Sequence, residues 1–133
     1  MKVGFIGLGN VGAKLAGSLL RNGVNLTVRD LAPDAARPLL DRGANWADSP
    51  AALAEHCDVV ITCLPSPAAS ASVMEAGDGL LAGLGPGKTW IEMSTTDEVE
   101  VKRLGARVAA IGAEAADCPV SGGCHRAATG NIS

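Results

Sequence analysis

The sequence predicts an α/β fold, a doubly wound parallel sheet of six strands with helices on both faces. Two observations predict it. Short apolar segments of strand length alternate strictly with segments of helical character along the 133 residues, and right-handed strand–helix–strand connections turn such a pattern into a parallel sheet. Hydrophobic residues make up 47% of the chain and charged residues 19%, which suits one buried core and, at this length, hardly more than one domain.

The predicted strands are short and mostly apolar, as strands buried on both faces of a sheet are. The clearest is 58–64, with the sequence DVVITCL, which two prolines follow closely. The remaining strands are 2–8, 25–30, 44–46, 89–93 and 113–120.

The segments between the strands carry helical signals. In the first of them, Val11, Leu15 and Leu19 recur at i, i+4 and i+8, and a glycine follows where the helix should end. The last begins with a capping box of Thr95 and Glu98. Its apolar face consists of Val101, Leu104, Val108 and Ile111. The other predicted helices run from Pro33 to Gly43, over 50–56 and over 68–75, with one further turn at Leu80–Leu81.

Charge and cysteine content exclude several classes of protein. The net charge of −3 provides no basic surface for nucleic acid, and no uninterrupted apolar stretch is long enough to span a bilayer. The N-terminal MKVGFIGLG lacks the cleavage region of a signal peptide. We expect reduced thiols in a cytoplasmic protein and no metal site, because the cysteines form no CxxC pair and no His–Cys cluster. They are Cys57, Cys63, Cys118 and Cys124.

A GxGxxG motif connects the first predicted strand to the first helix. Gly7 permits a tight turn, Gly9 lets a pyrophosphate approach the backbone, and Gly12 lets the helix pack on the strand. The N–H groups at the helix start then face the anion. The motif comprises Gly7, Leu8, Gly9, Asn10, Val11 and Gly12, all predicted to contact a dinucleotide cofactor.

Asp30, at the end of the second predicted strand, is the expected partner of the adenosine ribose. A carboxylate there accepts hydrogen bonds from ribose hydroxyls and repels a 2′-phosphate, so the sequence favours NAD over NADP. Arg29 lies beside it, but adjacent side chains of a strand point to opposite faces. The alternative is a glycine-rich turn used only for packing, with Asp30 a solvated strand end.

Four motifs together resemble one family closely. They are KVGFIGLGNVG from Lys2; CLP at 63–65, against the family's MLP; IEMST at 91–95, against (I/V)D(M/C)S(S/T); and DCPVSGGCHRAATG at 117–130, against DAPVSGGxxxAxxG. The chain resembles, over essentially its whole length, the N-terminal Rossmann domain of the β-hydroxyacid dehydrogenases, the group of 3-hydroxyisobutyrate dehydrogenase and tartronate semialdehyde reductase. Val11 departs from the family's usual methionine.

The resemblance implies further site residues. Leu64 and Pro65 would border the cofactor, and Thr95 would lie beside its nicotinamide half. Ser121, Gly122 and Gly123 would bind the substrate carboxylate, and two successive glycines do allow the N–H groups to form an anion-binding nest. The whole chain, 1–133, would be one NAD(P)-binding domain, with 119–133 holding this substrate-anchoring turn and the start of a truncated continuation.

Two alternatives stay open. Related 6-phosphogluconate dehydrogenases, which use NADP, carry Gly in place of Pro119 and usually an Asn-Arg pair where this chain has Asp30 and Leu31, which argues against them. A non-catalytic NAD-sensing or NAD-binding module is the second alternative.

The resemblance implies an oxidoreductase that transfers hydride between NAD and a small β-hydroxyacid, inactive as this chain alone. The family's catalytic lysine belongs to a helix beyond the chain end, so no catalytic residue is expected here. Lys2 and Lys88 start strands at the far edge of the sheet, Lys14 and Lys102 lie in helices, and His125 is expected to be a solvated loop residue. A homo-oligomer is plausible, because the missing helices would leave an apolar surface.

Overall fold

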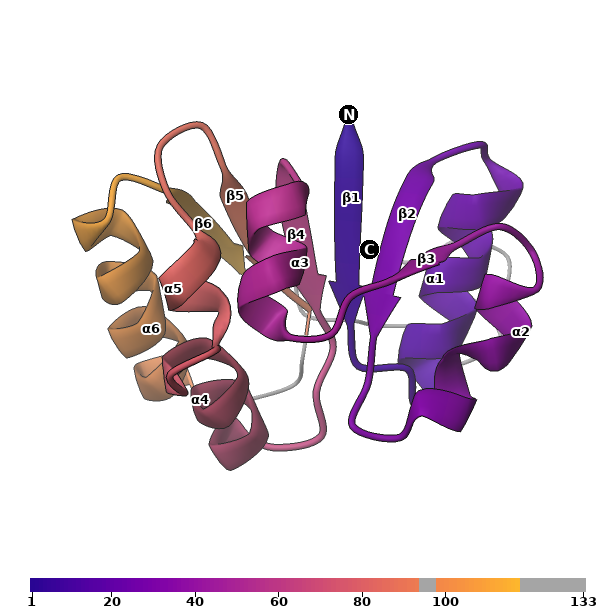
Figure 1. Cartoon of the computed structure of the whole chain (residues 1–133). Helices are drawn as coiled ribbons and strands as arrows, with labels where there is room; N and C mark the ends of the chain where they lie inside the picture. The colour runs from indigo at the N-terminus through magenta and orange to yellow at the C-terminus, as the bar shows by residue number, and fades with distance from the viewer. Residues whose placement is uncertain (94–97, 118–133) are drawn as a thin grey trace.

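A computed structural model describes residues 1–93 and 98–117 and contains the predicted sheet (Figure 1). All its strands are parallel, in the order β3-β2-β1-β4-β5-β6. This order runs outward in both directions from β1, as in doubly wound dinucleotide-binding folds, and it confirms the predicted fold class. The strands are β1 (Lys2–Ile6), β2 (Asn25–Arg29), β3 (Asn45–Trp46), β4 (Val59–Thr62), β5 (Thr89–Glu92) and β6 (Glu114–Asp117).

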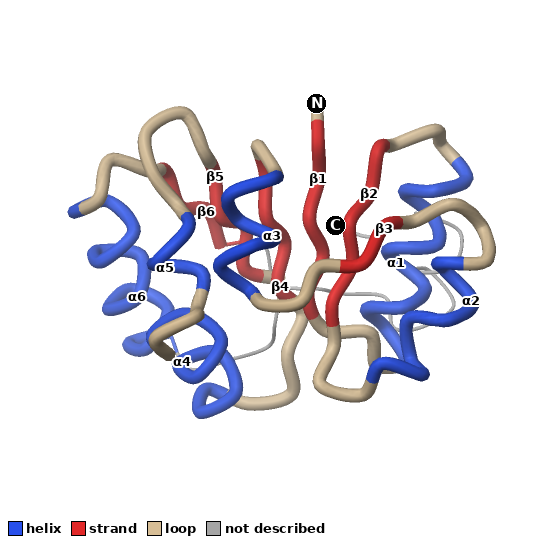
Figure 2. Tube along the Cα trace, in the orientation of Figure 1, coloured by secondary structure: helices blue, strands red, loops and turns tan. Residues whose placement is uncertain are grey.

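The helices connect successive strands (Figure 2). The single helix predicted from Pro33 to Gly43 is wrong in detail, because it is a 3₁₀ turn followed by one short α-helix. Pro38 explains the division, since proline has no N–H to donate to a preceding turn and is tolerated only in the first turn of a helix. The helical elements are α1 (Asn10–Arg21), η1 (Pro33–Ala36), α2 (Arg37–Leu40), α3 (Pro50–His56), α4 (Pro67–Glu75), α5 (Leu80–Gly83) and α6 (Glu98–Ala110).

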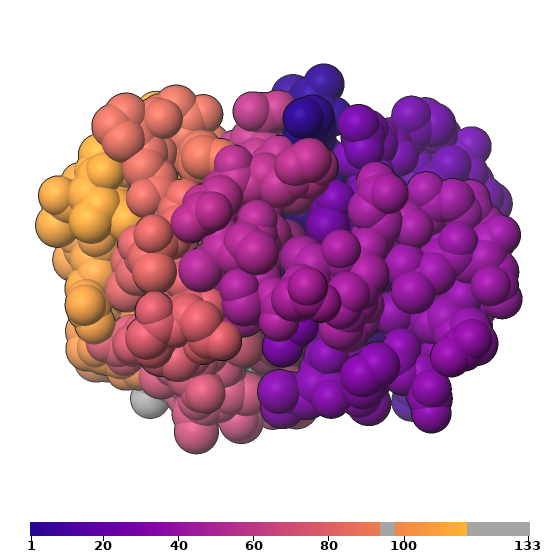
Figure 3. All heavy atoms as spheres, in the orientation of Figure 1, coloured from indigo at the N-terminus to yellow at the C-terminus, as the bar shows by residue number. Residues whose placement is uncertain are grey.

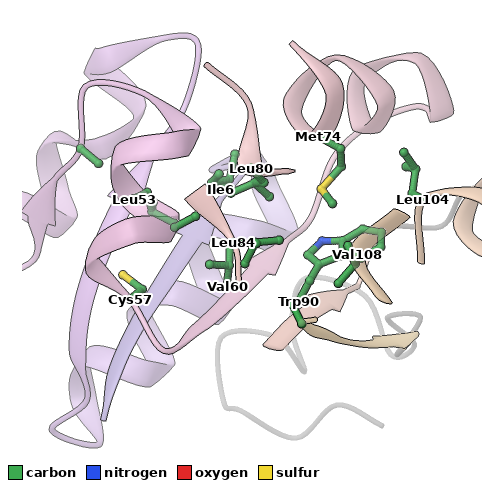
Figure 4. Close-up of a cluster of buried hydrophobic side chains, with 13 residues drawn as sticks. Ile6, Leu53, Cys57, Val60, Met74, Leu80, Leu84, Trp90, Leu104 and Val108 are labelled. Carbon is green, nitrogen blue, oxygen red and sulfur yellow. The ribbon is translucent and has the colours of Figure 1, made fainter. Parts of the chain in front are cut away.

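One hydrophobic core lies between the sheet and α3, α4, α5 and α6 (Figure 4). Trp90 of β5 is its largest side chain and is 1% exposed. In β1, Gly4 faces α3 so closely that an added Cβ would lie 2.2 Å from the Leu53 side chain. Figure 3, in the orientation of Figure 1, shows the atoms of these helices in front of the sheet. The cluster includes Ile6, Leu53, Val60, Met74, Leu80, Leu84, Trp90, Leu104 and Val108.

A second core lies on the opposite face, between the sheet and α1, η1 and α2. It contains Val3, Phe5, Leu8, Ala16, Leu26, Val28, Ala36, Leu39 and Ala44. Side chains of β1 enter both clusters, Val3 and Phe5 the second and Ile6 the first. Helices therefore cover both faces of the sheet, as predicted.

The predicted apolar faces of two helices are only partly right. In α1 the most buried residues include Gly12 and Ala16, because small side chains let the helix lie close to β1, while Leu15 and Leu19 are half-buried against the same cluster. In α6, Leu104 and Val108 are fully buried. Ile111 lies beyond the helix end and is 36% exposed, because the chain turns towards β6 at Gly112, whose φ is +83°.

Candidate dinucleotide site

The predicted site residues that the structure describes lie at the carboxyl edge of the sheet, where β1 and β4 are side by side. Ile6 and Thr62, the last residues of these strands, are paired in register. From β1 the chain passes to α1 on one face, and from β4 it passes to α4 on the other (Figure 1). Such a switch point is where open α/β sheets bind their ligands.

Two glycines of the motif are required by the fold itself. Gly7 has a φ of +102°, and a Cβ added to it would lie 2.1 Å from the carbonyl oxygen of Cys63. A Cβ on Gly12 would lie 1.8 Å from the carbonyl oxygen of Gly7. Both positions therefore exclude any side chain, as the motif predicts for a tight turn and for close helix–strand packing.

Gly9 is different, because the described fold does not require a glycine there. Its φ of −70° and ψ of −167° suit any residue, and among residues 1–93 and 98–117 no atom beyond its two chain neighbours lies within 4 Å of a Cβ built on it. A turn used only for packing explains Gly7 and Gly12 but not Gly9. The open space at Gly9 fits the approach of a phosphate to the backbone.

The N-terminus of α1 is suited to an anion. Gly9 occupies the N-cap position and has no side chain to accept from the first N–H groups, and the first turn of α1 contains no acidic residue. In contrast, Ser49 caps α3 by accepting from the Ala52 N–H at 3.1 Å, and Ser66 caps α4 by accepting from the Ala69 N–H at 3.1 Å. In the described part of the chain no side chain therefore caps the first N–H groups of α1, and such groups can bind an anion.

Asp30 holds the glycine turn against the loop that follows β2. Its Oδ2 accepts a hydrogen bond of 2.7 Å from the N–H of Leu8, and its Oδ1 accepts one of 2.9 Å from the N–H of Ala32. A carboxylate has about four acceptor positions, so ribose hydroxyls can still donate to it. The sequence pattern predicted the ribose role but missed this contact with the turn.

Arg29 is held by β3 and its neighbours. Its Nη1 donates to the carbonyl oxygen of Ala47 at 3.0 Å, and the guanidinium carbon lies 5.5 Å from the centre of the Trp46 ring. Asp30 and Arg29 therefore have different partners, as expected for neighbours at a strand end.

Leu64 and Pro65 follow β4 after Cys63, and Leu64 lies next to the glycine turn. The N–H of Cys63 donates to the carbonyl oxygen of Ile6 at 2.9 Å, and a Cβ on Gly7 would lie 3.1 Å from Leu64 Cδ2. The structure thus brings residues 7–12, Asp30, Leu64 and Pro65 to one edge. The other predicted site residues, Thr95, Ser121, Gly122 and Gly123, lie outside the described residues, as do Cys118, Pro119, Cys124 and His125.

A buried polar network beneath this edge was not predicted. Glu92, the last residue of β5, is fully buried. Its Oε1 accepts from Thr62 Oγ1 at 2.9 Å, and its Oε2 accepts from Ser70 Oγ at 3.1 Å. Thr62 Oγ1 in turn accepts from Trp90 Nε1 at 2.9 Å. The spacing of Trp90 and Glu92 was a usable signal, because residues i and i+2 of a strand share a face.

Two cysteine thiols and one lysine ammonium group are further reactive groups of the described residues. Cys57 and Cys63 are free, and burial raises the pKa of both thiols, with the Glu92 charge raising that of Cys63 further. Lys88 Nζ donates to the carbonyl oxygens of Ala54 and Cys57, each at 2.6 Å, at the amino edge of the sheet.

In the described ranges no group of three His, Cys, Asp or Glu residues is arranged to hold a metal ion. No helix there is long and apolar enough to cross a membrane.

The sequence is similar to those of known dehydrogenases. Residues 2–133 match the family described as the NAD binding domain of 6-phosphogluconate dehydrogenase. Mitochondrial 3-hydroxyisobutyrate dehydrogenase of Rattus norvegicus is 40% identical over 130 residues, which are 98% of this chain and 39% of that enzyme.

Two solved structures are similar over the whole domain. "Psf3 in complex with NADP+ and 2-OPP" has a TM-score of 0.93 and 34% identity, covering 98% of this chain and 46% of that one. A 3-hydroxyisobutyrate dehydrogenase from Salmonella typhimurium has a TM-score of 0.91 and 31% identity, covering 100% and 46%. This chain therefore spans less than half the length of these relatives.

Proposed function

The chain belongs to the family of the NAD binding domain of 6-phosphogluconate dehydrogenase, within its β-hydroxyacid dehydrogenase branch, and on that premise we propose that the whole protein transfers hydride between NAD and a small β-hydroxyacid. The chain is the domain that binds NAD. Its bound cofactor supplies the hydride acceptor, and the residues of this chain hold that cofactor. The observation that carries this proposal is the open space at Gly9, in front of the uncapped start of α1.

Each part of the carboxyl edge has a proposed task. The N–H groups of residues 9–12 bind the pyrophosphate, where the positive end of the α1 dipole also favours an anion. Asp30 accepts from the adenosine ribose while holding the turn through Leu8. Leu64 and Pro65 border the cofactor beyond β4, and Thr95 contacts its nicotinamide half.

We propose that NAD is preferred to NADP. A 2′-phosphate placed near the Asp30 carboxylate would meet a like charge. Leu31, which follows it, is 92% exposed and provides no cation for a phosphate. Arg29 is already engaged by Ala47 and Trp46. The similar structure of Psf3 was solved with NADP+, so both cofactors have to be compared.

The substrate end of the site is proposed to lie in 119–133. There Ser121, Gly122 and Gly123 would bind the carboxylate of the hydroxyacid, and residues 1–133 would form one domain. No lysine of the chain is proposed as the acid–base group. Lys2 starts β1 and Lys88 directly precedes β5, both at the amino edge, and Lys14 and Lys102 are exposed on helices.

The compartment and the oligomeric state are further proposals. Two free cysteine side chains in the described part suit a reducing compartment, and we propose the cytoplasm. Cell fractionation tests it, and recovery in mitochondria would contradict it. We also propose that the whole protein forms a homo-oligomer, which sedimentation can test.

Calorimetric titration of the 133-residue chain with NAD and with NADP tests the cofactor proposal. We expect NAD to bind, and NADP to bind more weakly because of Asp30. A chain that is folded by circular dichroism but binds neither cofactor would contradict the proposal. Hydroxyacid oxidation is expected only from a protein that also contains the acid–base lysine, so turnover by the chain alone would contradict the assignment of that group.

A further inference from the structure

Glu92 is a carboxylate placed where packing alone would favour an apolar side chain. It lies at the end of β5, on the face that also holds Trp90, and is 0% exposed. Burying a carboxylate is unfavourable unless it is hydrogen-bonded, and an apolar residue of similar volume is often as stable or more stable there. The hydrogen bonds of Glu92 are therefore the feature to explain.

The direction of each hydrogen bond in this network is fixed by chemistry. An indole N–H can only donate, so Thr62 Oγ1 must accept from Trp90 Nε1, which lies 2.9 Å away. The hydroxyl proton of Thr62 is then available for Glu92 Oε1. Ser70 donates from α4 to Oε2 at 3.1 Å. One side chain thus fastens β5 to β4 and to α4.

The network lies directly beneath the loops of the cofactor edge. Ile6, Thr62, Glu92 and Asp117 end β1, β4, β5 and β6 and are paired in one row across the sheet. Just beyond this row, the Met93 N–H donates to the Thr62 carbonyl oxygen at 2.8 Å. Leu64 and Pro65, proposed to border the cofactor, follow β4 in the sequence, and Thr95, proposed to contact the nicotinamide half, comes three positions after Glu92.

We propose that Glu92 is a positioning residue, whose hydrogen bonds to Thr62 and Ser70 set the spacing of the β4 and β5 ends on which the nicotinamide half of the cofactor rests. This inference rests on the proposed function. The proposal divides the cofactor site into an adenosine and pyrophosphate half and a nicotinamide half. The adenosine and pyrophosphate half depends on residues 7–12 and Asp30, while the nicotinamide half depends on the network of Glu92.

The experiment measures the two halves separately on the 133-residue chain. ADP-ribose lacks nicotinamide, so its affinity by calorimetry reports the first half. The nicotinamide fluorescence of bound NADH reports the second. In Glu92→Leu we expect the fluorescence change on NADH binding to fall to less than half that of the wild type, while the Kd for ADP-ribose stays within about twofold. Glu92→Gln keeps a carbonyl acceptor and should restore most of the signal.

Two further variants make the result decisive. Ser70→Ala removes one hydroxyl from a fully buried position and should give the same selective loss in smaller degree, so it decides the matter if Glu92→Leu does not fold. Val60→Ala is the matched control. Val60 is fully buried on β4 in the same core, and its truncation should lower stability without changing the fluorescence of bound NADH.

Each other outcome has a definite meaning. A wild-type chain that binds neither ADP-ribose nor NADH overturns the proposed function. A wild-type chain that binds both but leaves the NADH fluorescence unchanged overturns the role of Glu92 and keeps the proposed function. The role of Glu92 is also overturned if folded Glu92→Leu and Ser70→Ala retain the full fluorescence change of NADH. It is overturned as well if these variants lose ADP-ribose affinity to the same degree as they lose the fluorescence change.

Discussion

The Oδ2 atom of Asp30 accepts a 2.7 Å hydrogen bond from the N–H of Leu8, so the residue proposed to bind the ribose also holds the glycine turn. The two residues are 22 positions apart. This contact couples the adenosine end of the site to the pyrophosphate end. A substitution at Asp30 should therefore affect both cofactor selectivity and the stability of the turn.

Asp30→Asn tests this coupling. The variant loses the charge that repels a 2′-phosphate and weakens the acceptor for Leu8, so we expect the free energy of unfolding to fall by about 1 kcal/mol. We expect NAD affinity to fall about tenfold, with the NAD preference over NADP reduced. Urea unfolding and calorimetry measure these effects. Asp34→Asn is the control, because Asp34 is 97% exposed and pairs with Arg37 at 3.9 Å. Tighter binding of NADP than NAD by the wild type would contradict the argument.

Gly9→Ala and Gly12→Ala make the same chemical change with opposite expected results. At Gly9 the added methyl group has no described residue within 4 Å apart from its two chain neighbours, so we expect a stability loss below about 1 kcal/mol and a large loss of NAD affinity. At Gly12 the methyl group would lie 1.8 Å from the Gly7 oxygen, so the fold itself should be destabilised. Thermal unfolding and NAD titration of both variants measure this. Normal NAD affinity in Gly9→Ala would argue against a phosphate at that position.

Much of the fold followed from local patterns, while the contacts that build the site did not. Alternation and handedness predicted the parallel sheet, whereas the order of its strands comes from the structure. The GxGxxG motif predicted the roles of Gly7 and Gly12, but the group that excludes a side chain at Gly7 is the carbonyl oxygen of Cys63, which follows the end of β4. Local periodicity cannot identify such a neighbour.

Glu92 illustrates the same limit. Its strand was predicted, yet its hydrogen-bond partners Thr62 and Ser70 are 30 and 22 positions away. They meet it only because β4 lies beside β5 and α4 packs on both. The division of the helix at Pro38 could have been predicted from the sequence, because a proline at that place interrupts a continuous helix. The prediction of one helix from Pro33 to Gly43 was wrong because it did not take this proline into account.

Lys88→Met tests the role of the lysine at the amino edge. Lys88 Nζ donates to three carbonyl oxygens near the C-terminus of α3, those of Ala54, Glu55 and Cys57. These are charge-assisted bonds at the negative end of a helix, so we expect a loss of about 1–3 kcal/mol in the free energy of unfolding. NAD affinity should not change, because this edge is opposite the site.

Lys102→Met is the matched control for Lys88→Met. Lys102 is exposed and pairs with Glu98 at 3.1 Å on the surface of α6, and such a pair contributes less than about 1 kcal/mol. Equal effects of the two substitutions in urea unfolding would show that the bonds to the α3 carbonyl groups add nothing.

Glu75 makes stability depend on acid pH. Hydrogen bonds from Arg103, and then from Arg107, lower the pKa of the Glu75 carboxyl from 4.5 to about 2. A lowered folded-state pKa contributes stability above the unfolded value of 4.5, and this stability is lost as pH falls from there towards about 2. Glu75→Gln should therefore flatten the decline of stability across that window, measured by urea unfolding at several pH values. Arg103→Met should flatten it as well, because Arg103 donates to both Glu75 and Glu100 and lowers the pKa of both carboxyl groups. An unchanged slope in Glu75→Gln would contradict the assignment of this acid sensitivity to the contact between α4 and α6.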